Sequence, residues 1–148
     1  FGFKDDAHPG GVSAGQLARL AREGHDLHPH YCNQSVAHVT ERLGIEGLDG
    51  KQAGEQVTHM RLNWGTVGAR AAQDRANAGA LVVAGLDGPG QVHTAIVTPG
   101  PGTTTPDGGF YPNVTCGGSS TTRSDGSRTA ADVWPPSDRG RVQYFVPR

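Results

Sequence analysis

Apolar and polar positions follow a helical period over the first half of the chain. In residues 13–23, Leu17, Leu20 and Ala21 fall on one face of a helix. Ser13 is a suitable N-terminal cap for this helix, and Gly24 is a suitable end. The same pattern recurs further along the chain. We predict helices over residues 13–23, 32–43, 52–62 and 67–77, an irregular segment over 25–31, and ends at Gly44 and Gly79 for the second and last helices.

The period changes after residue 79, where short apolar runs and alternating runs replace the helical pattern. We predict strands over residues 80–84, 92–98, 110–116 and 141–146, and loops over 99–109 and 117–128. Turn-forming residues 87–90 (DGPG) separate the first two strands, which should therefore pair as a hairpin. Helices followed by an antiparallel sheet predict an α+β fold.

The composition fits one compact domain with a modest core. The 148 residues suit a single domain over residues 1–148, and 23 Gly and 10 Pro provide loop material. A net charge of −1 gives no strong field toward nucleic acid or anionic lipid. No apolar run approaches the roughly 18 residues that span a bilayer. We therefore expect no binding to nucleic acid and no insertion into a membrane. We also expect a monomer.

The first residues do not resemble a secretory signal. Residues 1–11 carry Lys4, Asp5, Asp6 and His8 and have no apolar central segment. If the protein leaves its cell, we expect it to use a route that needs no signal peptide.

Cys32 and His93 are the candidates for nucleophilic chemistry. Cys32 stands at the start of the predicted helix over 32–43, where exposed N–H groups and the helix dipole stabilise a thiolate. His93 lies in a predicted strand of small and apolar residues, where an imidazole needs a partner to offset its desolvation. A thiolate across a helix–sheet seam would be that partner. The alternatives are a buried thiol or a disulfide with Cys116, the second of the two cysteines, and a histidine bonded to backbone.

A second pattern has the ligand types of a zinc site. It consists of His25, His28, His30 and Cys32. Pro29 interrupts it, and no second half of a site is evident in the sequence. We favour a solvated loop here, and we expect no metal and no cofactor.

The order and spacing of these residues resemble a known family, the papain-like NlpC-type cell-wall peptidases. More narrowly, they are similar to the family-1 amidase effectors of bacterial type VI secretion, from about Cys32 to Phe145. The matching residues are Cys32 with its helix through Leu43-Gly44, the block GALVVAGL over 79–86, the His93 strand with Ala95-Ile96-Val97, Tyr111-Pro112, Cys116-Gly117, Val133-Trp134, Asp138-Arg139, Arg141 and Tyr144.

The resemblance implies both a reaction and a setting. It implies a cysteine peptidase in which N-terminal helices pack on a small antiparallel sheet, with Cys32 as nucleophile and His93 as base. The bond implied is the amide between D-glutamate and meso-diaminopimelate in peptidoglycan stems. The setting implied is delivery by type VI secretion into the periplasm of a rival cell. A cognate immunity protein would block the active site in the producing cell.

The residues around the pair depart from the family in places. The family motif has Ser-Gly after the nucleophile, where this chain has Asn33-Gln34. The first N–H groups of this helix, including that of Asn33, are candidate oxyanion donors. The family often has Gly before the histidine, where this chain has Val92.

A third group usually orients the histidine of such a pair. Asn113, Thr115 and Cys116 on the next predicted strand are candidates. Cys116 matches a family cysteine near the site, while Asn113 offers a side-chain carbonyl. A backbone carbonyl is an equally good alternative.

Two other functions stay open at the level of the sequence. One is a Cys–His acyltransferase of the same fold, in which an amine or alcohol replaces water. The other is a non-catalytic binding module stapled by a disulfide between Cys32 and Cys116.

Overall fold

The computed structural model describes residues 12–148, and our expectation for residues 1–11 falls outside them. The helices are α1 (Ala14–Leu27), α2 (Cys32–Arg42), α3 (Ala53–Asn63), α4 (Ala69–Asn77), α5 (Ala130–Val133) and α6 (Pro136–Arg139). The strands are β1 (Gly65–Val67), β2 (Val83–Leu86), β3 (His93–Val97), β4 (Thr103–Thr104), β5 (Phe110–Tyr111), β6 (Asn113–Cys116), β7 (Ser124–Thr129) and β8 (Gln143–Val146). The predicted α+β class is confirmed.

The four longer helices lie close to where the apolar period predicts them. Ser13 caps α1 by accepting from the Gln16 N–H, and Oε1 of Gln16 accepts in turn from the Ser13 N–H. The predicted end at Gly24 is wrong, because the helix continues to Leu27. Gly24 serves packing instead: a Cβ at this position would lie 2.7 Å from the carbonyl oxygen of Ser35 in α2.

The main sheet has the strand order β1-β8-β2-β3-β6-β7, and all its pairs are antiparallel. The predicted hairpin is confirmed as β2 and β3, with Leu86 opposite His93. The predicted strand over 80–84 is displaced toward the turn. The strand predicted over 110–116 is divided into β5 and β6 at Pro112, which has no N–H to continue a ladder.

Three strands lie where the apolar pattern gives no sign of them. β1 is short, β4 pairs with β5 in a separate small sheet, and β7 occupies part of the predicted loop over 117–128. β7 (SDGSRT) is a polar edge strand in which only the two end residues, Ser124 and Thr129, are buried. An apolar-run criterion therefore misses it.

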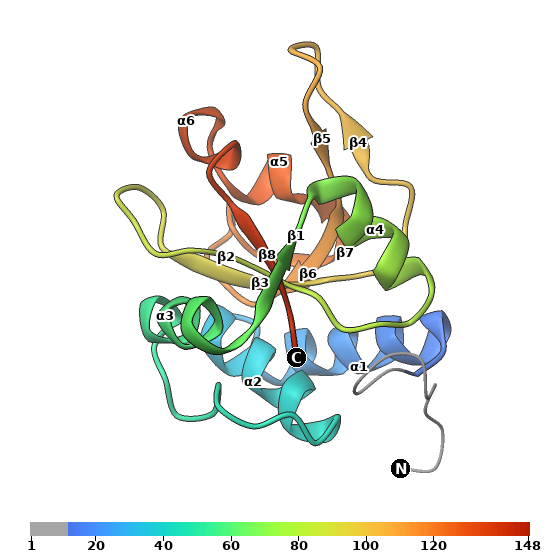
Figure 1. Ribbon diagram of the computed structural model, residues 1–148, viewed down its shortest axis with the longest axis vertical. Helices are drawn as coiled ribbons and strands as arrows, with labels where there is room; N and C mark the ends of the chain where they lie inside the picture. The colour runs from blue at the N-terminus through green and yellow to red at the C-terminus, as the bar shows by residue number, and fades with distance from the viewer. Residues whose placement is uncertain (1–11) are drawn as a thin grey trace.

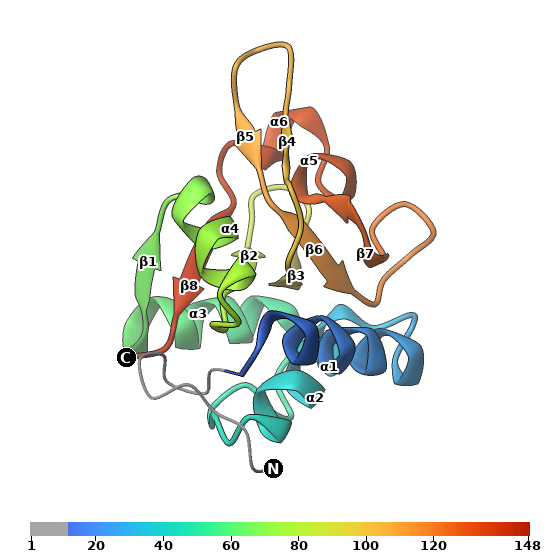
Figure 2. The ribbon, with the colours of Figure 1, turned by 90° about the vertical axis from the view of Figure 1, so that its right-hand side faces the viewer.

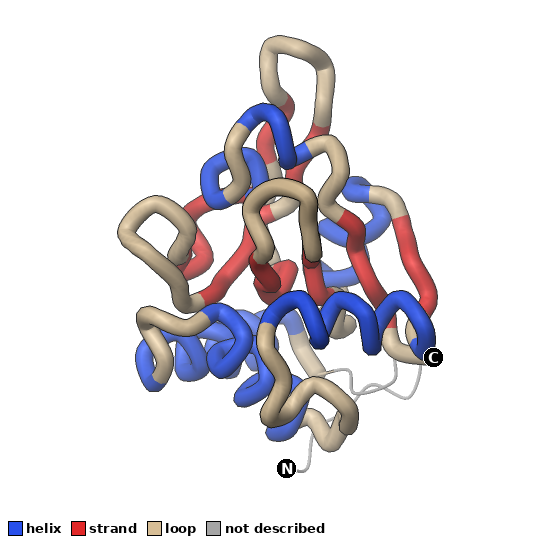
Figure 3. Tube along the Cα trace, turned by 90° about the vertical axis from the view of Figure 1, so that its left-hand side faces the viewer, coloured by secondary structure: helices blue, strands red, loops and turns tan. Residues whose placement is uncertain are grey.

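Helices α1, α2 and α3 form a layer on one side of the sheet. Figure 1 shows α1, α2 and α3 together below the strands, with α5 and α6 above them. Figure 2 shows the same arrangement after a 90° turn, with the β4–β5 hairpin projecting away from the lower helices. In the Cα trace of Figure 3, helices lie below the strands and shorter helical segments lie above them. Helix α2 packs against both α1 and β3, so Cys32 and His93 lie on neighbouring elements.

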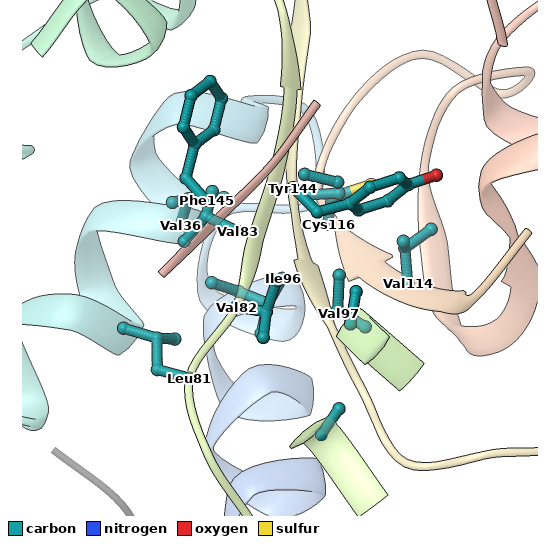
Figure 4. Close-up of a cluster of buried hydrophobic side chains, with 14 of the residues drawn as sticks. Val36, Leu81, Val82, Val83, Ile96, Val97, Val114, Cys116, Tyr144 and Phe145 are labelled. Atoms are coloured by element: carbon teal, nitrogen blue, oxygen red, sulfur yellow. The ribbon is translucent and has the colours of Figure 1, made fainter. Parts of the chain in front are cut away.

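Part of the core lies between α2, α3 and the central strands, and buried residues of α1, α4 and α5 extend it. Val36, Val83 and Phe145 are buried together in the cluster of Figure 4, whereas Tyr144 points to the opposite side of its strand. Gly85 of β2 allows α3 to approach closely, because a Cβ there would lie 2.8 Å from the Val57 side chain. Within residues 12–148, no helix is long and apolar enough to cross a membrane.

Candidate active site

Cys32 is the first residue of α2, and it is partly exposed. Tyr31, the preceding residue, has an extended backbone and supplies no side-chain cap to the helix. The first backbone N–H groups of a helix have no partner within the helix. The N–H of Ser35 bonds the carbonyl of Tyr31 (3.0 Å). The N–H groups of Cys32, Asn33 and Gln34 are therefore the ones that can meet a negative charge on the sulfur or on a bound substrate.

The turn after β6 holds the start of α2 in place. Ser35 donates from Oγ to the carbonyl of Cys32 (3.0 Å) and accepts from the backbone N–H of Gly117 (2.8 Å). The N–H of Gly118 donates to the carbonyl of Pro29 (3.0 Å). A Cβ on Gly117 would lie 2.0 Å from the carbonyl oxygen of His28, so only glycine allows this approach. The backbone on both sides of Cys32 is thereby tied to β6.

His93 is the first residue of β3 and is 2% exposed. Its Nε2 lies 3.3 Å from Sγ of Cys116, at the end of β6. The pairing of β3 with β6 explains this contact. Ile96 lies opposite Thr115, and because the strands are antiparallel, Cys116 lies nearer the His93 end of β3. The edge of Trp134 packs on the imidazole at 5.2 Å between ring centres.

Burial sets the charge of the histidine. Desolvation lowers the pKa of His93 from 6.5 to about 4, and the carbonyl of Thr122 opposes this only in part. The imidazole is therefore neutral near pH 7, so one of its nitrogens carries a lone pair and can accept a proton.

Cys116 is a buried thiol. Its Sγ donates to the carbonyl of Thr122 (3.3 Å). Desolvation raises the pKa of the Cys116 thiol, and the nearby Cys32 sulfur raises it further through charge repulsion. A sulfur that donates to Thr122 accepts from Nε2–H of His93, which leaves the lone pair of the ring on Nδ1. Both cysteines are free thiols, so the structure lacks the disulfide on which the binding-module alternative rests.

The structure separates the candidates for the third group. Cys116 contacts His93, whereas the side chain of Asn113 accepts from the N–H of Gly102 (2.8 Å) and donates to the carbonyl of Gly126 (3.1 Å). The Thr115 hydroxyl pairs with that of Thr98 (3.0 Å). Asn113 and Thr115 therefore hold the neighbouring loop and strand rather than the imidazole.

Asn33 replaces the serine of the family motif, and its side chain has a hydrogen-bond partner. Its Nδ2 donates to the carbonyl of Lys51 (2.9 Å), on the loop before α3. An open pocket of about 420 Å³ lies beside this turn. The pocket is lined mainly by polar residues: His28, Asn33, Gln34, His38, Glu41, Asp49, Lys51 and Gln52, with Ala37 and Gly50.

Sequence reasoning missed two polar residues that hold this region. Ser35 gives no signal in the sequence, because its role depends on Gly117 far along the chain. Gln56 gives a signal that could have been read: it lies four residues before the core residue Met60, on the face of α3 that the helical period buries. A fully buried glutamine needs several hydrogen bonds, and these mark it as a connecting residue.

Two of the histidines before Cys32, His25 and His28, contact other side chains. His25 pairs with Asp26 (2.9 Å), and the ring of His28 lies tilted against that of His38, with 6.3 Å between ring centres. Within residues 12–148, no group of three or more His, Cys, Asp or Glu side chains is arranged to hold a metal ion.

The sequence of this chain has a curated relative. Over 119 residues it is 34% identical to the peptidoglycan amidase Tse1 of Pseudomonas aeruginosa, and the match covers 78% of this chain and 73% of that protein. The chain belongs to the Tse1 family. No protein-family model matches it. Membership of the Tse1 family confirms, at the level of the family, the resemblance to cell-wall amidases that the motifs around Cys32 and His93 indicate.

Proposed function

We propose that this protein is a cysteine amidase that hydrolyses a peptide-stem amide of bacterial peptidoglycan. The observation that carries the proposal is the contact of His93 with Cys116 on the strand next to the helix that begins at Cys32. Ser35 bridges the carbonyl of Cys32 and the N–H of Gly117, which follows Cys116, and this supports the closeness of the two cysteines. The name of the relative, a peptidoglycan amidase, supports the substrate.

In the proposed mechanism, His93 acts as a neutral general base. With Nε2–H directed to Cys116, Nδ1 accepts the proton of the Cys32 thiol. The sulfur attacks the carbonyl carbon of the stem, and backbone N–H groups at the start of α2, including that of Asn33, stabilise the oxyanion. The protonated imidazole then gives its proton to the leaving amine, and water hydrolyses the acyl-enzyme through the same imidazole.

The finer identity follows the family resemblance. We propose a papain-like NlpC-type enzyme, a single catalytic domain that cuts the amide between D-glutamate and meso-diaminopimelate. We further propose that it is a monomeric effector delivered by type VI secretion into the periplasm of a target cell, and that a cognate immunity protein blocks its active site in the producer. The pocket beside Asn33 and Lys51 is lined by neither Cys32 nor His93, but it adjoins Cys32 through Asn33, and we propose that its polar lining receives part of the stem.

The test is digestion of purified diaminopimelate-type peptidoglycan, followed by mass analysis of the fragments. We expect the wild type to release fragments cut between D-glutamate and diaminopimelate, and Cys32→Ala to lose at least about a thousandfold of this activity. Circular dichroism should show that the variant remains folded, because Cys32 is only partly buried.

Three outcomes would contradict parts of the proposal. Lysis by a folded Cys32→Ala variant would remove the nucleophile. Fragments cut at another amide would correct the bond. Transfer of the stem to an added amine in preference to water would indicate the acyltransferase alternative.

A further inference from the structure

Gln56 connects the two elements that carry the proposed reacting groups. It is fully buried in α3. Its Nε2 donates to the carbonyl of Asn33 (2.9 Å), the residue after Cys32. Its Oε1 accepts from the hydroxyl of Thr94 (2.9 Å), the residue after His93. One side chain thus joins the neighbour of the nucleophile to the neighbour of the base.

The orientation of the Gln56 amide is determined by its partners. Nε2 also donates to the carbonyl of Leu48 (3.1 Å), so the amino group meets two carbonyl oxygens. Carbonyl oxygens only accept hydrogen bonds, and the amide therefore cannot be reversed without losing both. Thr94, at the other end, is fully buried as well.

The carbonyl of Asn33 belongs to the same planar peptide unit as the N–H of Gln34. Holding that carbonyl fixes the direction of an N–H in the first turn of α2, where no helical partner exists. Ser35 and Gly117 hold the preceding unit through the carbonyl of Cys32. The first turn of α2 is thereby fixed from the α3 side by Gln56 and from the β6 side by Ser35.

We propose that Gln56 is a positioning residue, which sets the separation of Cys32 from His93 and aims the first N–H groups of α2 at the reacting carbonyl. This inference rests on the proposed function for the identity of the reacting groups. Gln56 touches neither of them, and it acts through Asn33 and Thr94. A displacement of about 1 Å between reacting groups can lower a rate by about a hundredfold.

The test uses Gln56→Glu and Gln56→Met, both close in size to glutamine. A carboxylate at position 56 faces the carbonyls of Asn33 and Leu48 and has no proton to give them. Its burial raises its pKa, and the neutral acid restores one donor. With a soluble stem peptide, we expect kcat to fall about tenfold or more in both variants, with less than about a twofold change in KM. The activity of Gln56→Glu relative to wild type should rise as the pH falls from about 8 to about 5.

The chain offers a matched control in Gln73. This glutamine of α4 is also buried and also makes three hydrogen bonds: Nε2 to Asn77 (3.0 Å) and to the carbonyl of Thr98 (2.9 Å), and Oε1 from the N–H of Asn113 (2.8 Å). Gln73→Glu should lose a similar amount of stability. Activity per folded molecule should stay within about twofold of wild type, because Gln73 joins neither α2 nor the His93 end of β3.

Alkylation of Cys32 by iodoacetamide provides a second readout that needs no substrate. We expect Gln56→Glu to change its rate at least about threefold relative to wild type, while Gln73→Glu leaves it unchanged. Wild-type kcat and wild-type alkylation in folded Gln56 variants would overturn the positioning role, as would equal losses in the Gln56 and Gln73 variants. An inactive wild type with a Gln56-dependent alkylation rate would overturn the proposed function and leave the positioning role standing.

Discussion

The two cysteines differ in surroundings although both are free thiols. Cys32 is partly exposed at a helix start, whereas Cys116 is fully buried and burial raises its pKa. We therefore predict that iodoacetamide near pH 7 modifies Cys32 at least about a hundredfold faster than Cys116 in the folded protein. Peptide mapping by mass spectrometry over a time course measures both rates.

The unfolded protein is the control for this labelling. In denaturant the two thiols should react at similar rates, because the burial that protects Cys116 is lost. Faster labelling of Cys116 in the folded state would contradict the assignment of Cys32 as the nucleophile.

The buried imidazole of His93 should link stability to pH. Its pKa is about 4 in the folded protein and 6.5 when unperturbed, so the unfolded chain binds the proton more tightly. The part of the free energy of unfolding that depends on a neutral His93 is complete above about pH 6.5 and is lost as the pH falls toward 4. A pKa shift of this size corresponds to about 3 kcal/mol in the free energy of unfolding.

A His93→Gln variant isolates this contribution, because the other titrating groups are common to both proteins. We predict that the free energy of unfolding of wild type minus that of the variant decreases by about 2 kcal/mol between about pH 7 and pH 4.5. Chemical denaturation at several pH values measures it. A constant difference would show that the imidazole does not titrate as its burial requires.

At the scale of elements, the turn after β6 and the segment before α2 are in backbone contact. A Cβ at position 117 would lie 2.0 Å from the carbonyl oxygen of His28 and 2.9 Å from that of Tyr31. We predict that Gly117→Ala lowers the free energy of unfolding by about 2 kcal/mol and lowers amidase activity by more than the unfolded fraction explains. Denaturation curves and the peptidoglycan assay measure the two effects.

Gly15→Ala is the matched control for this substitution. Gly15 lies inside α1, and a Cβ there meets nothing within 4 Å. Alanine should therefore raise the free energy of unfolding by up to about 1 kcal/mol and leave activity unchanged. Equal effects of the two substitutions would contradict the close approach at residue 117.

The apolar pattern of the sequence predicts most of the longer helices correctly but fails at Gly24 and at β7. The apolar period places α2, α3 and α4 well, because each buries one face on the sheet. It places Gly24 wrongly at a helix end, because a glycine needed for close packing of two helices looks the same as a glycine that stops one. It misses β7, whose pairing with β6 depends on backbone bonds rather than on apolar side chains.

At the scale of the whole molecule, the candidate site is assembled from distant segments. Cys32 comes from α2, His93 from β3 and Cys116 from β6, and Gln56 of α3 ties the first two together. The prediction of a single domain over residues 1–148 remains a prediction. Helices α1, α2 and α3 lie beneath the strands in Figure 1, and α2 packs against β3 there.

The sequence by itself determined the class of fold, the approximate positions of the longer helices, the β2–β3 hairpin, and the choice of Cys32 and His93 as candidates. These depend on local periodicity, on turn residues, and on residue types whose chemistry is intrinsic. Only the tertiary structure decided that Cys116 rather than Asn113 contacts the imidazole, that burial keeps His93 neutral, and that Gln56 bridges two elements. The reason is physical: hydrogen-bond partners and desolvation depend on which distant segments meet, and strand register and helix packing set those meetings.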